Sequence, residues 1–160
     1  MTKRKKRPSS VYSLMDELTA SPVNPMPVAM RNSQLTQMLT GLNALEKDVE
    51  PKIRDWQVVS DAINLVETLV VMRVCADESG LLADAVAAMA KAGQRHLAGG
   101  NIRLDAAGIQ AVRAVIEDYA SMLDVVPHRD MVHCHRLTEK RILEIFKGKN
   151  LPHDVKVIAL

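Results

Sequence analysis

The chain has 160 residues, enough for one domain with short tails. Hydrophobic residues make up 48% of it and charged residues 25%, as in an ordinary globular protein. No run approaches the ~18 apolar residues of a membrane span, so the composition excludes a membrane-spanning protein.

The formal net charge of +2 is unevenly distributed. Five of the 21 basic residues form an N-terminal arm, namely Lys3, Arg4, Lys5, Lys6 and Arg7. From Pro8 onward, the other 16 basic residues face 19 acidic ones, a net charge of −3. Such an arm either keeps the chain solvated or contacts nucleic-acid phosphates without sequence preference. The body is not a nucleic-acid binder by charge alone.

Aromatic residues are scarce: Tyr12, Trp56, Tyr119 and Phe146 are the complete set. A core built from Leu, Val, Ile, Ala and Met favours helix-on-helix packing over a β-sandwich. The only two cysteines, Cys75 and Cys134, lie far apart. Because no secretory hydrophobic segment follows the basic start, we expect a cytoplasmic protein with reduced thiols.

Taken in chain order, the first predicted element is a short helix after the cap candidates Ser9 and Ser10. Its apolar residues are Tyr12, Leu14, Met15 and Leu18. Pro22, Pro25 and Pro27 then exclude regular structure, so this segment is a linker or a strap laid over the body. A second helix follows, with Asn32 or Ser33 as the expected cap.

The longest periodic stretch is residues 53–75, which no proline or glycine interrupts. Its second half is apolar on most sides, which predicts a helix in the middle of a bundle. A helix over residues 81–97 should stop at Gly99-Gly100. We expect Ile102 and Leu104 to plug one end of the bundle, and Asp105 to cap the next helix. Pro127 opens the last helix, which ends near Gly148.

The sequence therefore predicts an all-α fold: a single bundle of four to five helices with a basic N-terminal arm and a proline-rich strap. The expected divisions are residues 1–27 for the arm and linker, 28–148 for the bundle, and 149–160 for a C-terminal tail.

Few residues suggest site chemistry. His128, His133, Cys134 and His135 are metal-type ligands, but His133 and His135 are two apart and point to different helix faces. The acidic pairs Asp61 with Glu67 and Glu117 with Asp118 lack the spacing of facing carboxylates. No phosphate-binding loop or nucleophile motif is present. We expect no metal, no cofactor and no enzymatic activity.

The last two helices form a candidate helix-turn-helix for DNA binding. The second of these is basic, and its candidate contacts are Arg129, Arg136, Lys140 and Arg141. Arg129, Arg136 and Lys140 lie at i, i+7 and i+11, hence on roughly one side, where they could contact phosphates or base edges. A long surface helix also carries basic residues near its C-terminus to suit the helix dipole.

Two blocks carry a family resemblance. Residues 62–69, AINLVETL, and residues 129–131, RDM, match the pattern of a group of small uncharacterised phage and prophage proteins. Those proteins share a basic, proline-containing N-terminus and are sometimes labelled Fis-like transcriptional regulators. The similarity covers roughly residues 50–145. It implies a phage-borne accessory protein acting inside a bacterial cell, and it supplies no catalytic residues.

Two functions remain open. In the first, the protein is a nucleic-acid-associated regulator, with the arm and the last helix contacting DNA. In the second, it is a helical protein–protein interaction module bound to a host or phage protein, such as an adaptor, an inhibitor or a subunit. A homodimer is compatible with both, and no membrane partner is expected.

Overall fold

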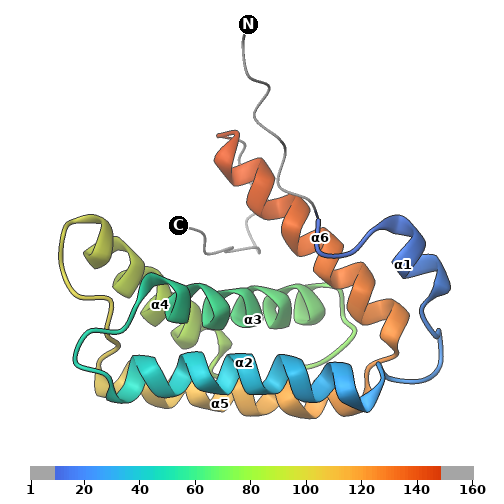
Figure 1. Ribbon diagram of the computed structural model, residues 1–160, viewed down its shortest axis with the longest axis horizontal. Coiled ribbons are helices and arrows are strands. Elements are labelled where there is room, and N and C mark those ends of the chain that lie inside the picture. Colours follow the sequence, from blue (N-terminus) through green and yellow to red (C-terminus); the bar gives the residue numbers. More distant parts are fainter. Residues whose placement is uncertain (1–9, 149–160) are drawn as a thin grey trace, which may run out of the picture.

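The computed structural model describes residues 10–148, which form six helices (Figure 1). No described residue lies in a strand, so the predicted all-α class is confirmed. Five helices are long, and the sixth, α1, is the short helix that the sequence predicted ahead of the bundle. The helices are α1 (Leu14–Thr19), α2 (Val28–Lys47), α3 (Ile53–Val71), α4 (Leu82–Leu97), α5 (Ala106–Val125) and α6 (His128–Phe146).

Helix α3 lies at the centre of the bundle, as its apolar pattern predicted. All residues from 62 to 69 are buried, and the helix packs against α2, α4, α5 and α6. It ends at Val71, four residues earlier than the predicted end at Cys75. Arg73 adopts a left-handed φ of 59°, and the amides of Val74 and Cys75 turn back to the carbonyl of Leu69.

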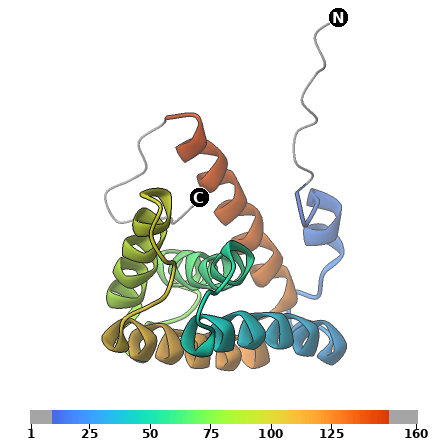
Figure 2. The ribbon, with the colours of Figure 1, turned by 60° about the vertical axis from the view of Figure 1, so that its left-hand side comes forward.

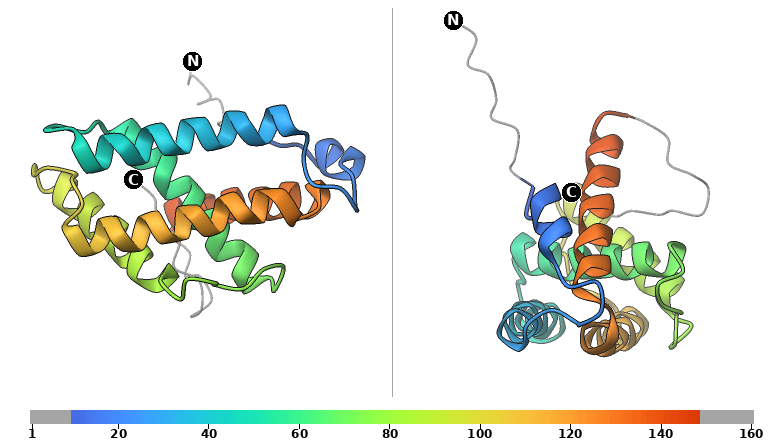
Figure 3. Two further views of the ribbon diagram at one scale, coloured as in Figure 1. Left: turned by 90° about the horizontal axis from the view of Figure 1, so that it is seen from below. Right: turned by 90° about the vertical axis from the view of Figure 1, so that its right-hand side faces the viewer.

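Helices α2 and α5 run side by side, and α3 crosses over them (Figures 1 and 3). Gly41 permits the close approach of α2 to α3, because a Cβ there would lie 3.0 Å from the carbonyl oxygen of Asp55. The indole of Trp56 joins α3 to α4 by donating to the carbonyl of Met89 at 3.0 Å.

The connection from α4 to α5 follows the sequence prediction. Helix α4 ends before Gly99, which has a φ of 84° that L-amino acids other than glycine rarely adopt. Ile102 and Leu104 are buried at that end of the bundle. Asp105 caps α5, its carboxylate accepting from the amide of Gly108 at 2.7 Å.

Helix α6 leaves the bundle at an angle, and its C-terminal end extends beyond the other helices (Figure 2). Its first half packs on α3 through buried Met131 and Cys134. The hydroxyls of Thr68 and Thr138 meet at 2.7 Å between the two helices.

No side chain caps the start of α6. Backbone carbonyls of residues 21–27 cap the helix instead. The amide of His128 donates to the carbonyl of Asn24 at 2.8 Å, and the amide of Arg129 donates to the carbonyl of Ser21 at 2.9 Å. Because the first amides of a helix have no partner within it, these carbonyls complete its first turn. The segment is also anchored by Met26, which is 2% exposed. This path places α1 beside α6.

Candidate functional site

Helix α1 begins with a hydrogen-bonded cap at Ser13. The Ser13 hydroxyl accepts from the amide of Asp16 at 3.1 Å, and the Asp16 carboxylate accepts from the amide of Ser13 at 2.6 Å. This reciprocal capping box satisfies two amides that the helix leaves unpaired. The cap is Ser13, three or four residues after the candidates Ser9 and Ser10.

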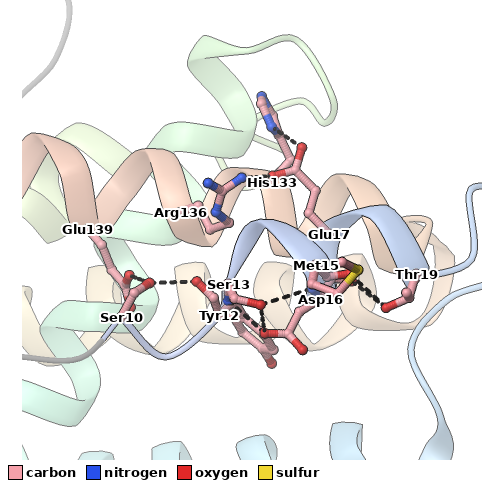
Figure 4. Close-up of polar contacts among 10 residues, drawn as sticks. All are labelled: Ser10, Tyr12, Ser13, Met15, Asp16, Glu17, Thr19, His133, Arg136 and Glu139. Carbon is pink, nitrogen blue, oxygen red and sulfur yellow. Dashed lines mark hydrogen bonds and ion pairs between the residues drawn. The ribbon is translucent and has the colours of Figure 1, made fainter.

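Polar side chains attach α1 to α6 (Figure 4). The carboxylate of Glu17 pairs with Arg136 and lies 2.8 Å from Nδ1 of His133. The Arg136 guanidinium lowers the pKa of Glu17 below its usual value, and His133 adds to this effect. Arg129 donates to the carbonyls of Leu18 at 3.0 Å and Ala20 at 3.2 Å, which satisfies the C-terminal end of α1.

The residues before α1 are held by the same helix. The hydroxyl of Ser10 donates to the carboxylate of Glu139, and the amide of Val11 donates to that carboxylate at 2.9 Å. The segment from Ser10 to Ala20 therefore lies along α6 on charged and hydrogen-bonded contacts.

The apolar side chains of α1 face away from the body. No residue of the helix is buried. Three large side chains of the helix are exposed, Leu14 by 55%, Met15 by 66% and Leu18 by 58%. Val11, two residues before the cap Ser13, is 75% exposed, and we term these four side chains the α1 apolar face. A surface helix normally turns such a stripe toward the core. Here the polar Glu17 is turned toward α6 and the apolar stripe toward solvent.

The basic residues predicted as DNA contacts on α6 have different surroundings. Arg129 and Arg136 both lie against α1. Arg141 is half-buried and donates to the hydroxyl of Thr68 at 3.2 Å, on the side of α3. Lys140 is exposed. The five basic residues Lys3 to Arg7 lie outside the described residues.

A pocket of about 230 Å³ opens where residues 11 and 12 cross α2, α3, α5 and α6. We call it the Tyr12 pocket. The hydroxyl of Tyr119 donates to Gln34 at 2.9 Å, and the amide of Gln34 donates to the hydroxyl of Tyr12 at 3.3 Å. The rings of Tyr12 and His135 lie 5.2 Å apart. Its polar lining consists of Tyr12, Gln34, Gln37, Asp61, Tyr119 and His135.

Two groups of this pocket have shifted pKa values. Burial lowers the pKa of His135 to about 4, which keeps the imidazole neutral at pH 7. Asp61 lies at the rim of the pocket, where partial loss of solvation by the surrounding protein and then the neighbouring Glu139 carboxylate raise its pKa to about 6. Because Asp61 is exposed, water screens much of the repulsion between the two carboxylates.

Sequence analysis did not identify Tyr12, Glu17 or Glu139 as site residues. Their partners are more than 100 residues away in the chain for Glu17 and Glu139, and no local spacing encodes such contacts. The pattern Ser13-x-x-Asp16 was an available signal for the start of α1. The prediction that His133 and His135 point to different faces is confirmed: His133 contacts Glu17, and His135 contacts Tyr12.

The ion pair between Arg136 and Glu17 should stabilise α1 on α6. In Arg136→Gln the Glu17 carboxylate loses its guanidinium partner, so amides of residues 14–20 should exchange with solvent roughly two- to fivefold faster. Lys140→Gln is the matched control, because it removes the same charge from the exposed side of α6. Hydrogen exchange followed by mass spectrometry measures both. Equal exchange of α1 in the two variants would show that the Glu17 contact does not hold it.

The buried His135 gives the chain a pH-dependent stability. The unfolded chain takes up a proton on this residue near pH 6.5, and the folded chain only near pH 4, so stability falls as pH drops between them. Asp61 acts in the opposite sense, because the folded chain protonates it first. Between pH 7 and pH 5, wild type should lose about 1–2 kcal/mol more than His135→Gln in urea unfolding.

The exposed His96 on α4 provides the control for this measurement. His96→Gln should keep the wild-type difference between the two pH values. Asp61→Asn should increase the loss of stability on acidification, because it removes the group that acts in the opposite sense. A wild-type pH dependence in His135→Gln would contradict the assignment.

Within residues 10–148, no group of three or more His, Cys, Asp or Glu side chains is arranged to hold a metal ion. No helix of this part of the chain is long and apolar enough to cross a membrane. Comparisons with protein-family models, with curated proteins and with solved structures find no match to this chain.

Proposed function

We propose that the chain is a non-enzymatic accessory or regulatory protein of a phage or prophage that acts by binding another protein through the α1 apolar face. The observation that carries this proposal is the orientation of α1. Its polar Glu17 is turned toward α6, while Val11, Leu14, Met15 and Leu18 are exposed.

These exposed side chains gain little from burial in the isolated chain. Fully burying a side chain of this size is worth about 1.5–3 kcal/mol, and four such groups lie between residues 11 and 18. Within α1, Leu14 and Leu18 stand at i and i+4, a spacing found among the anchors by which a helix lies in a hydrophobic groove. We infer that the partner offers such a groove and that α1 is held in a helical form before binding, which reduces the entropy lost on association.

The basic arm supports the same mode of binding. Arg7 lies four residues before Val11, so five positive charges precede the first anchor. Such charges accelerate association with a surface of opposite sign and contribute more to rate than to affinity. A partner groove with an acidic rim would match both parts of the N-terminal segment.

Site-directed photo-crosslinking tests this proposal in cells that carry the phage or prophage. A photoreactive residue at Met15 should form an adduct with one defined protein. Leu14→Glu with Leu18→Glu should abolish the adduct, because two charges would enter an apolar groove. Leu97→Glu is the control, since Leu97 is 72% exposed on α4, a helix that α1 does not contact.

All these side chains are exposed, so each variant should keep the wild-type far-UV circular dichroism and unfolding temperature. An adduct with a second copy of the chain would assign the partner as a homodimer. Failure to crosslink at Met15, or an adduct that survives both glutamates, would refute the proposal.

Nucleic-acid binding is the second candidate function, and the arm from Lys3 to Arg7 favours it. The exposed Lys140 could add one contact, whereas Arg129, Arg136 and Arg141 are engaged within the chain. Residues 10–148 carry 14 basic and 18 acidic side chains, so most attraction for DNA would come from the arm.

A salt series on mixed-sequence duplex DNA tests this second function. If the arm contacts DNA, deleting residues 1–8 should reduce the slope of log affinity against log salt by about 0.9 for each phosphate that the arm neutralises. Its five basic residues can neutralise at most roughly five phosphates, which sets the upper limit of the reduction. Absence of binding by the full-length chain at low salt would exclude the function.

A further inference from the structure

We propose that the Tyr12 pocket binds the ammonium group of a primary amine, with the Asp61 carboxylate as its counter-ion. This site adjoins the α1 apolar face at Val11, and the two proposals can fail independently.

The charge of the pocket is uncompensated. Its lining contains no Lys or Arg side chain. Asp61 forms no hydrogen bond or ion pair with any residue between 10 and 148. The charged group that acts on the pKa of Asp61 is a second carboxylate, that of Glu139, which already accepts from Ser10 and Val11. A bound cation would offset the repulsion between these carboxylates.

One buried nitrogen of the lining has no partner, and in the tautomer that carries the proton on Nδ1 it can accept from an ammonium group. The Gln34 oxygen already accepts from Tyr119, and the Gln34 amide already donates to Tyr12. The buried His135 is neutral, and its Nε2 has no partner within the described part of the chain. An unpaired buried polar atom costs free energy that a suitable donor recovers. An ammonium group supplies three donors and one positive charge.

The ring of Tyr12 lies beside His135, with the two ring centroids 5.2 Å apart. We infer that a ligand reaches Nε2 by a shift of that ring. The segment that carries Tyr12 is held on one side by the Glu139 contacts and on the other by the helix start at Ser13. The ring then offers its face to the cation, a favourable contact in a partly desolvated site.

The size and the walls of the pocket define the ligand class. About 230 Å³ is less than a drug-sized ligand requires. Met38, Val58 and Leu65 provide an apolar wall, which suits an alkyl chain behind the ammonium group. The ammonium group belongs either to a free small amine or to a lysine side chain of a bound protein. Val11 lines this pocket and is also part of the α1 apolar face, so a partner on that face lies within reach.

The experiment titrates the full-length, isotope-labelled protein with two probes at millimolar concentration and follows amide chemical shifts. n-Butylammonium represents the free amine, and lysine with both ends capped represents the protein side chain. n-Butanol is the neutral analogue. Asp61→Asn removes the counter-ion, and Asp84→Asn removes an equal charge from an exposed position on α4.

We expect saturable shifts at Tyr12, Gln34 and His135, with an affinity about tenfold lower in Asp61→Asn and unchanged in Asp84→Asn. Binding of n-butylammonium without capped lysine assigns a free amine, and binding of capped lysine, with or without n-butylammonium, shows that a protein side chain fits the pocket. The proposal is overturned if neither probe shifts these residues. It is also overturned if Asp61→Asn binds as tightly as wild type, or if n-butanol binds as well as the amine.

Discussion

The central constraint in this structure is that part of α3 has no solvent-facing side. Residues 62–69 are all buried, so four other helices must cover them: α2, α4, α5 and α6. Each large apolar side chain removed from water contributes about 1.5–3 kcal/mol, and no other helix has so continuous a buried run. The packing of α2 with α5 and the first half of α6 follows from covering α3. Helix α1 buries no residue and is not required for this core.

That division separates a core held by apolar burial from an N-terminal segment held by charge. Exposed ion pairs are weak, so the segment from Ser10 to Ala20 belongs to the low-stability part of the molecule. The cations that attach it, Arg129 and Arg136, also stand where a DNA-contacting helix would need them free. Their internal use is a physical reason to favour a protein partner over nucleic acid.

The spacing of apolar residues and the residues that start or stop helices predicted most of the helices, because both depend on nearby positions in the sequence. The apolar run of α3, the glycine stop after α4 and the Asp105 cap all depend on neighbours in sequence. The sequence placed the start of α2 at Asn32 or Ser33, which are preferred cap residues. The helix begins several residues earlier, at Val28, directly after Pro27. The partner of Arg136 is 119 residues away, and no charge pattern specifies such a contact. Periodicity likewise defines the apolar stripe of α1 and leaves its direction open.

The two proposed sites meet at adjacent residues. Val11 contributes to the α1 apolar face and lines the Tyr12 pocket, and Ser13 begins the helix immediately afterwards. A ligand that displaces the Tyr12 ring moves the residues that lead into α1. Any effect of an amine on partner affinity must then equal the effect of the partner on amine affinity, because binding free energies are linked. A partner that carries a suitably placed lysine would occupy both sites in one complex. Its groove would bury the α1 apolar face, and the pairing of its lysine with Asp61 would fix its position along α1.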